Sequence, residues 1–318
     1  MSKKHYPDFL LVGAARAGTT AIDRYLRQHP EIFLPRVKEP CFFAFAGMTT
    51  EYKRGKFSFA VTDSESYEKL FKDRKPNQLA GDLSTPYLFL YKQTLENIQR
   101  YHPDPKRLRI VILLRQPVDR AYSQYRWRLR DGREELSFAE AVAAEPIRKR
   151  EGFSFDYLYL ERSYYAAALQ AYRDQFPHVH IIFYEDLRKD PLLVMQGLCR
   201  FLGVDPEFPF QAIGEVNGTW SPRYPWLSRL VTFEHPLKYR LLNRIPGHWR
   251  DSIRAGFTKI NAVKHAEEQL DPEYRRQLTE RFTAELPSAD DVWQVGLIVG
   301  PSGAGKSTVA RQAFGAQL

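Results

Sequence analysis

The most constraining feature of this chain is a short apolar run near its N-terminus that ends in a glycine-rich loop. Residues 9–12 predict a buried strand, the run breaks at Gly13, and a helix is expected to begin at Thr19-Thr20. In such a unit the loop directs backbone N–H groups and one fixed cation at an anion on the helix N-terminus. We therefore expect a phosphate group to be bound by these residues: Ala15, Arg16, Ala17, Gly18, Thr19 and Thr20.

This loop resembles the nucleotide-triphosphate motif G-x-x-x-x-G-K-[ST] without matching it. Gly13 and Gly18 keep the glycine spacing, but Thr19 stands where that motif has its lysine. The cation lies inside the loop instead, as Arg16, so the bound phosphate group need not belong to a triphosphate. A strand–helix turn with incidental glycine and threonine is the alternative for this segment.

Size and composition allow a globular protein with one large core or two modest ones. Of the 318 residues 43% are hydrophobic, and no apolar run is long enough to cross a bilayer. No secretory signal is visible, and the two cysteines, Cys41 and Cys199, cannot build a disulfide framework, so we expect a reduced, cytoplasmic setting. The net charge of +9 suits anionic ligands, and no clustered Cys and His spacing predicts a metal site.

Apolar runs alternate with helical segments along most of the chain. Strands are expected over residues 9–12, 79–83, 108–114 and 179–184. Helices are expected over residues 20–28, 64–73, 92–101, 117–130, 137–144, 161–175, 191–202 and 262–285. This alternation predicts an α/β fold with three layers, in which a parallel sheet is flanked by helices.

A second group of polar residues follows the expected strand at residues 108–114. Arg115 stands at its carboxyl end, the edge where ligands of open α/β sheets bind. The helix that begins at Pro117 carries Arg120 and Ser123 on one face because they are three residues apart. Arg115 and Ser123 together would clamp a second phosphate group, whereas a salt-bridged strand end is the alternative for Arg115.

Two further segments carry candidate chemistry. Lys38 and Glu39 precede Pro40 in an expected loop, and a carboxylate beside a cation could take a proton from an acceptor hydroxyl or amine. A surface turn with a solvated ion pair is the alternative. The segment Gly81–Tyr87 is a strand that leads into a Ser-Thr-Pro turn, for which an ordinary helix cap is the alternative.

Together these segments resemble the sulfotransferases that use 3′-phosphoadenosine 5′-phosphosulfate (PAPS), in particular the bacterial and glycan-type branch that includes the heparan sulfate sulfotransferases. The 5′-phosphosulfate loop of that family is similar to residues 13–20, and its 3′-phosphate motif matches residues 114–123. Its Lys-Glu-Pro-x-Phe-Phe segment matches residues 38–43, and its Thr/Ser-Pro-x-Tyr segment matches residues 81–87. The likeness covers residues 7 to 285.

The resemblance implies an enzyme with a P-loop nucleoside-triphosphate-hydrolase-like sulfotransferase fold. Such an enzyme moves a sulfuryl group in line from PAPS to a hydroxyl or amine of a glycan or small metabolite, and PAP is the second product. Lipid, peptide and polyketide alcohols are alternative acceptors. The resemblance makes Glu39 the base for the acceptor, while Lys38 would stabilise transferring or leaving oxygens. Arg16 would neutralise charge on the departing 5′-phosphate.

The same resemblance assigns the nucleotide contacts. Arg115 and Ser123 would hold the 3′-phosphate. Arg115 and Arg16 are therefore expected on the same face of the protein, close enough for one nucleotide to bind both. Asn217, Arg223 and Ser221 form a polar cluster that would close over the nucleotide, with a plain loop as the alternative. Arg16 replaces a lysine of many relatives, and Cys41 replaces a histidine common in the glycan branch.

A full match to G-x-x-x-x-G-K-[ST] stands at Gly300–Ser307, after an apolar run, and 11 residues follow it. Because the distant acidic residue for Mg²⁺ and the rest of a sheet are missing, residues 288–318 are expected to be the start of a second, truncated domain or a fusion remnant. Residues 1–287 would form the sulfotransferase domain.

An ATP- or GTP-binding P-loop protein and a non-catalytic module for anionic glycans are the alternative functions. Basic residues are not gathered in one stripe, so no nucleic-acid partner is expected.

Overall fold

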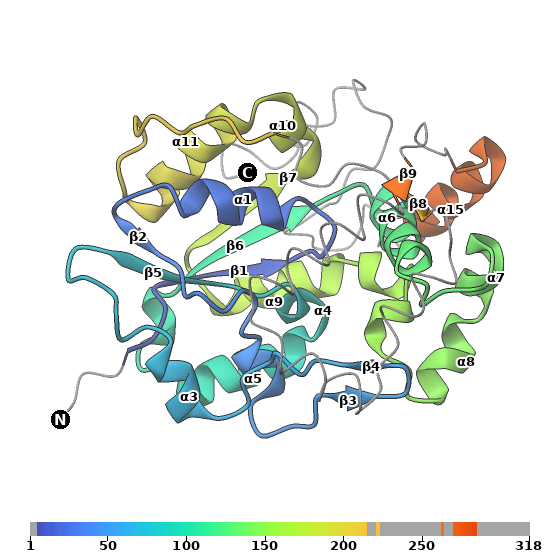
Figure 1. The fold of residues 1–318 in the computed structure, drawn as a ribbon, viewed down its shortest axis with the longest axis horizontal. Coiled ribbons are helices and arrows are strands. Elements are labelled where there is room, and N and C mark those ends of the chain that lie inside the picture. Colours follow the sequence, from blue (N-terminus) through green and yellow to red (C-terminus); the bar gives the residue numbers. More distant parts are fainter. Residues whose placement is uncertain (1–4, 215–220, 223–261, 264–269, 285–318) are drawn as a thin grey trace.

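Five parallel strands form the central sheet, in the order β2-β5-β1-β6-β7 (Figure 1). The computed structural model describes residues 5–214, 221–222, 262–263 and 270–284. The strands are β1 (Phe9–Gly13), β2 (Ile32–Phe33), β5 (Leu79–Leu83), β6 (Arg109–Leu114) and β7 (Val179–Phe183). The four predicted strands are confirmed, and the short edge strand β2 was not predicted. Almost all of β1 and β6 is buried, as parallel strands covered on both faces must be.

Helices cover both faces of this sheet, which confirms the three-layer arrangement (Figure 1). One face carries α1 (Thr19–Leu26), α10 (Tyr184–Lys189) and α11 (Pro191–Leu202). The other carries α2 (Phe42–Phe45), α3 (Ser64–Lys69), α4 (Pro86–Phe89), α5 (Tyr91–Tyr101) and α9 (Ala166–Gln175).

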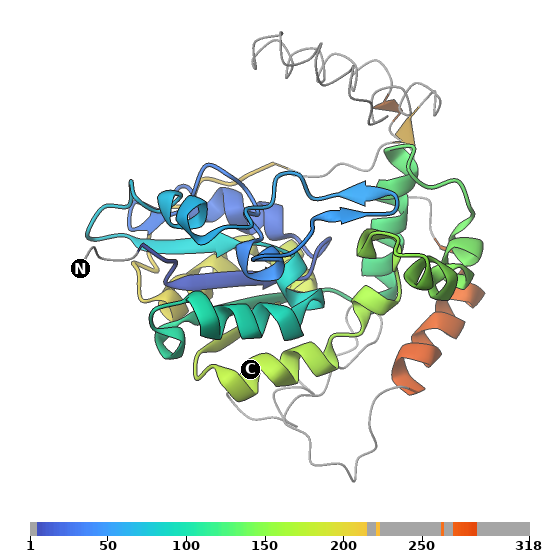
Figure 2. The ribbon, with the colours of Figure 1, turned by 90° about the horizontal axis from the view of Figure 1, so that it is seen from below.

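Past the carboxyl ends of the strands lies a further group of helices with its own small core. It comprises α6 (Pro117–Arg130), α7 (Phe138–Ala143), α8 (Glu145–Arg150) and α15 (Pro272–Ala284), with the 3₁₀ turns η2 (Phe155–Tyr157) and η3 (Glu161–Ser163). Phe138 of α7 and Phe282 of α15 are both buried in this core. The hairpin of β3 (Glu51–Tyr52) and β4 (Gly55–Lys56) reaches towards this group, where Lys53 pairs with Glu151 (Figure 2). The remaining elements are η1 (Pro105–Arg107), β8 (Ser221–Pro222) and β9 (Ala262–Val263).

Local sequence signals set several helix ends. Helices α6 and α11 have the predicted bounds, and the side chain of Asp190 caps α11 by accepting a hydrogen bond from the Leu193 N–H at 3.0 Å. The single helix predicted over residues 161–175 is wrong, because Tyr164 is extended and separates η3 from α9. The helix predicted from Ala262 is wrong at its start, since that residue lies in β9. Within the described ranges, no helix has the length and apolar character needed to span a membrane.

Candidate active site

The loop between β1 and α1 is held in a conformation that requires its glycine. Gly18 has φ +94°, and a Cβ added there would lie 2.9 Å from Cδ2 of Leu187 and 3.2 Å from Cδ2 of Tyr184. Arg16 also has a positive φ of 69°. The loop therefore packs tightly on α10 and presents Arg16 and the N-terminus of α1 at the carboxyl edge of the sheet.

The two predicted phosphate-binding groups lie in one cluster. Arg115, just past the end of β6, donates a hydrogen bond from Nη1 to the backbone carbonyl of Arg16 at 3.2 Å. Its guanidinium carbon lies 4.5 Å from the ring centre of Tyr184. Nε of Arg16 in turn donates to Oγ of Ser123 at 3.3 Å, so Ser123 meets Arg16 and not Arg115. The expected proximity of Arg16 and Arg115 is confirmed, although they are 99 residues apart in sequence.

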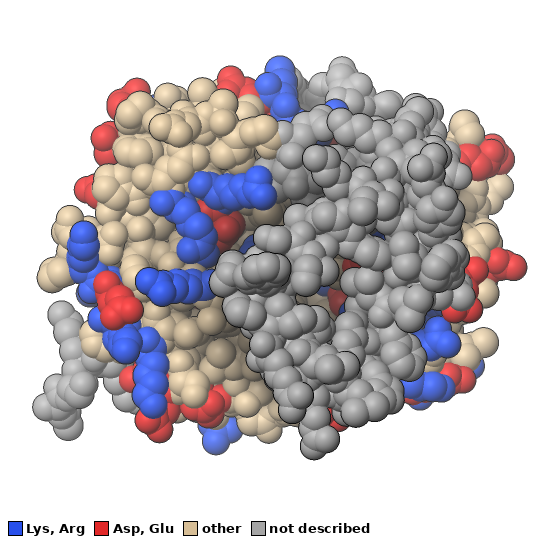
Figure 3. All heavy atoms as spheres, in the orientation of Figure 1, with Lys and Arg blue, Asp and Glu red and all other residues tan. Residues whose placement is uncertain are grey.

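The electrostatics of this cluster favour an anion. Burial, together with the positive charges of Arg130 and Arg115, lowers the pKa of Arg16 to about 10. Neither Arg16 nor Arg115 forms an ion pair with a carboxylate of the described residues. In the view of Figure 3, Lys and Arg side chains also gather over α1. The negative charge of Asp131 opposes the lowering of the Arg16 pKa only in part. A partly buried pair of cations that lacks an ion-pair partner among the described residues is costly, and a phosphate group would supply the missing negative charge.

Lys38 and Glu39 are neighbours in sequence, but their side chains have different partners. Nζ of Lys38 donates to Oγ1 of Thr20, in the first turn of α1, at 2.8 Å. Oε2 of Glu39 accepts a hydrogen bond from Oγ1 of Thr85 at 2.9 Å. Glu39 has φ +55°, in the left-handed region. The Lys38–Glu39 segment therefore connects the phosphate loop to the corner between β5 and α4.

The environment of Glu39 suits a proton acceptor. Burial raises the pKa of the Glu39 carboxyl above its ordinary value. The Thr85 hydroxyl and the charge of Lys38 oppose that shift, whereas the negative charge of Asp156 adds to it. A carboxylate whose pKa is moved upwards is a stronger base, while it stays ionised near neutral pH if the shift is moderate.

A buried carboxylate fixes the segment that carries Glu39. Asp82 accepts hydrogen bonds from the hydroxyls of Tyr67 at 2.7 Å, Tyr87 at 2.6 Å and Ser84 at 2.5 Å. Ser84 Oγ accepts a further bond from the backbone N–H of Cys41 at 2.9 Å. Burial raises the pKa of Asp82 to about 6. The sequence pointed to the Gly81–Tyr87 turn, but this support of the Glu39 segment was missed.

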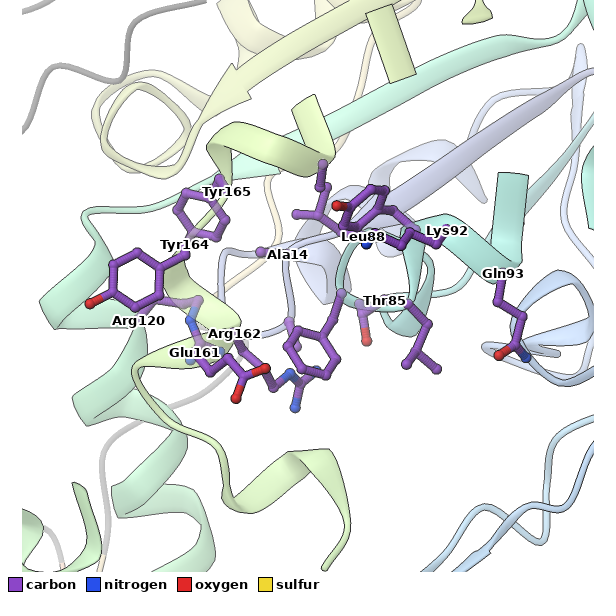
Figure 4. Close-up of a pocket in the computed structure, with 15 residues that line it drawn as sticks. Ala14, Thr85, Leu88, Lys92, Gln93, Arg120, Glu161, Arg162, Tyr164 and Tyr165 are labelled. Carbon is purple, nitrogen blue, oxygen red and sulfur yellow. The ribbon is translucent and has the colours of Figure 1, made fainter. Parts of the chain in front are cut away.

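A cavity of about 460 Å³ opens beside the cluster (Figure 4). Ala14 and Ala15 of the phosphate loop line it, and so does Thr85, the hydrogen-bond partner of Glu39. The figure shows Ala14, Thr85 and Leu88 between an end with Tyr164 and Arg120 and an end with Gln93. The cavity thus touches both the loop and the residue that holds the candidate base.

Some predicted features lie outside the described residues. These are Asn217, Arg223 and the Gly300–Ser307 motif, with the whole of the expected second segment at 288–318. Ser221 is described only as part of the backbone pairing of β8 with β9.

Comparisons with known proteins give one consistent result. The family model described as "Sulfotransferase family" matches residues 7–208. The crystal structure of a sulfotransferase from Alicyclobacillus acidocaldarius is 34% identical, with a TM-score of 0.60, over 77% of this chain and 99% of that chain. This likeness confirms the fold that the resemblance implied.

Two curated relatives are larger proteins. Human bifunctional heparan sulfate N-deacetylase/N-sulfotransferase 3 is 26% identical over 217 residues, which are 64% of this chain and 23% of that protein. Mouse heparan sulfate glucosamine 3-O-sulfotransferase 3B1 is 25% identical over 211 residues, which are 63% of this chain and 47% of that protein. The chain therefore spans less than half the length of these relatives.

Proposed function

The chain belongs to the sulfotransferase family, and we propose that it transfers a sulfuryl group from PAPS to a hydroxyl or amine of a glycan or small metabolite. The observation that carries this proposal is the contact between Arg115 and the carbonyl of Arg16, which unites two cation sites. Neither cation forms an ion pair with a carboxylate of the described part of the chain. A nucleotide with charged groups at both its 3′ and 5′ positions would supply two anions to this cluster.

The proposal gives the nucleotide-binding residues distinct parts. Backbone N–H groups of Ala15–Thr20 and the Arg16 guanidinium would hold the 5′-phosphosulfate. Arg115 and Ser123 would hold the 3′-phosphate, and each of them has a hydrogen bond with Arg16. Asn217 and Arg223 stay predicted contacts to the nucleotide.

The proposed step is a single displacement at sulfur. PAPS supplies a sulfuryl group on an activated oxygen. The acceptor oxygen or nitrogen forms the new bond to sulfur, and the bond from sulfur to the 5′-phosphate oxygen breaks, leaving its electron pair on PAP. Glu39 takes the proton of the acceptor, while Lys38 and Arg16 stabilise the charge that gathers on transferring and departing oxygens. Most of the rate enhancement would come from positioning and electrostatics.

Arg115→Ala should weaken PAP binding about 10- to 150-fold, since a hydrogen bond to a charged group contributes about 1.5–3 kcal/mol. Titration calorimetry with PAP and with ATP measures this effect, and the wild-type protein should prefer PAP. Arg107→Ala is the matched control, because Arg107 is exposed in η1 and has no proposed contact with the nucleotide. Equal affinity for ATP and PAP, unchanged in Arg115→Ala, would contradict the proposal.

Thr85→Val should move the acidic limb of the kcat/KM profile to higher pH. Its hydroxyl stabilises the ionised form of Glu39, so its loss raises the pKa of Glu39 further and the active carboxylate forms at higher pH. Thr85→Ser keeps a hydroxyl and should keep the wild-type limb. Initial rates across the pH range test this. If the acidic limb of kcat/KM were identical in the wild-type protein and both variants, Thr85 would not set the pKa of the catalytic base.

Domain limits and location are also part of the proposal. The pair of Arg275 in α15 with Asp119 in α6 supports a sulfotransferase unit that extends at least to α15, and the limit at residue 287 with a separate segment at 288–318 stays a prediction. A cytoplasmic setting is supported by Cys41 and Cys199, both of which are buried free thiols.

A further inference from the structure

We propose that the cavity beside Thr85 is the acceptor site and that it selects a small amphipathic alcohol, phenol or amine carrying an anionic group. This inference rests on the proposed sulfuryl transfer and adds a class of acceptor to it. An acceptor in this cavity would contact Ala14 and Ala15, which belong to the donor loop, and Thr85, which holds Glu39. The reacting atom would thus lie beside the donor loop and beside the residue that is hydrogen-bonded to the proposed base.

The walls of the cavity favour an apolar body. They are formed mainly by Leu88, Phe89, Leu90, Tyr91, Tyr164 and Tyr165, from α4, the start of α5 and the segment between η3 and α9. The volume of about 460 Å³ lies within the range for small-molecule sites. Aromatic walls of this kind bind a compact aryl or alkyl group better than a fully hydroxylated sugar chain.

Two of the four charged residues that line the cavity already form ion pairs. Glu161 accepts a hydrogen bond from Nζ of Lys149 at 2.7 Å. Arg162 donates from Nη1 to Oδ1 of Asp156 at 2.5 Å. Asp156 also pairs with Arg128, so its one negative charge is shared by two arginines.

The other two charged residues, Arg120 and Lys92, are cations that form no ion pair with a described residue, although the negative charge of Glu145 acts on Arg120. Arg120 is fully buried and donates to Ser163 Oγ at 2.6 Å and to the Tyr159 carbonyl at 2.5 Å, while its Nη1 has no partner. Lys92 is exposed at the start of α5, and its side chain forms no ion pair or hydrogen bond with a residue of the described ranges. Arg120 thus makes the potential inside the cavity positive, and Lys92 can reach an anion directly.

The test compares a carboxylate acceptor with its neutral partner in the wild-type protein. Hydroxyphenylpropanoate should be sulfated with a kcat/KM about tenfold above that of hydroxyphenylpropanamide, which has the same ring, hydroxyl and length. Lys92→Met should lower this ratio about fivefold, as loss of one partly exposed ion pair would, and leave the neutral amide unaffected. Lys106→Met, in η1, is the control and should change neither rate.

Further measurements separate failure of this inference from failure of the proposed function. Titration of the carboxylate into the PAP-loaded protein should give the same dependence on Lys92 without any turnover. If PAP binds but the carboxylate and amide bind or react equally, or if a heparosan oligosaccharide is the better acceptor, the inference is wrong and the function stands. If PAP does not bind, the proposed function fails and the inference with it.

Discussion

Glu39→Gln is expected to lower kcat about 10²- to 10⁴-fold and to leave the affinity for PAP nearly unchanged. Glutamine keeps the size of the side chain, and its amide oxygen can still accept the hydrogen bond that Thr85 donates to Glu39. It cannot take a proton from the acceptor, so the loss falls on the chemical step. Initial rates with radiolabelled PAPS, together with a PAP titration, measure the two effects separately.

Glu96→Gln is the matched control for this substitution, because Glu96 is an exposed residue of α5. It should have the kcat of the wild-type protein. The wild-type acidic limb of kcat/KM should lie above the pH expected for an ordinary glutamate, since burial raises the pKa of Glu39. Full turnover in Glu39→Gln would remove Glu39 as the base, whatever the pH profile.

The sequence predicts the sheet well because its strands are continuous apolar runs, and such runs are typical of parallel strands covered on both faces. It also predicts the ends of α6 and α11, because Pro117, Asp190 and Gly203 are local start and stop signals. It misses β2, which has only two residues and no periodicity of its own. It misses the break at Tyr164, because η3 is held by contacts to residues distant in sequence, such as the hydrogen bond from Arg120 to Ser163.

In the candidate site, too, some features follow from the sequence and others do not. Arg16 and Arg115 each follow a predicted strand, so their meeting at one sheet edge follows from topology. The contact of Glu39 with Thr85 spans 46 residues and depends on a positive φ at a non-glycine residue, which no sequence pattern marks. The sequence predicts that Asp82 lies in a strand, but it does not predict the role of its side chain. That role depends on the hydroxyl groups that bind the buried carboxylate, which are seen only in the folded chain.

Arg16→Ala should lower kcat about 10²- to 10³-fold, the effect of removing one donor that stabilises charge in the transition state. Arg16 stays protonated through the neutral range, because its pKa is lowered only to about 10. The wild-type rate should therefore show no loss from Arg16 deprotonation in the neutral range. Single-turnover rates at saturating PAPS isolate this effect from any loss of nucleotide binding.

Arg16→Lys distinguishes charge from geometry at the same position. Lysine keeps the charge but cannot donate to Ser123 through a guanidinium Nε, so kcat should recover in part and PAP affinity should stay reduced. Ser123→Ala removes the hydrogen bond to Arg16 together with a proposed contact to the 3′-phosphate, and at saturating PAPS it should lower kcat less than Arg16→Ala does, because the cation remains in the loop. If Arg16→Ala kept the wild-type kcat, another group would have to neutralise the charge on the departing 5′-phosphate. Lys38 is placed to do so, because its Nζ donates a hydrogen bond to Thr20 in the first turn of α1.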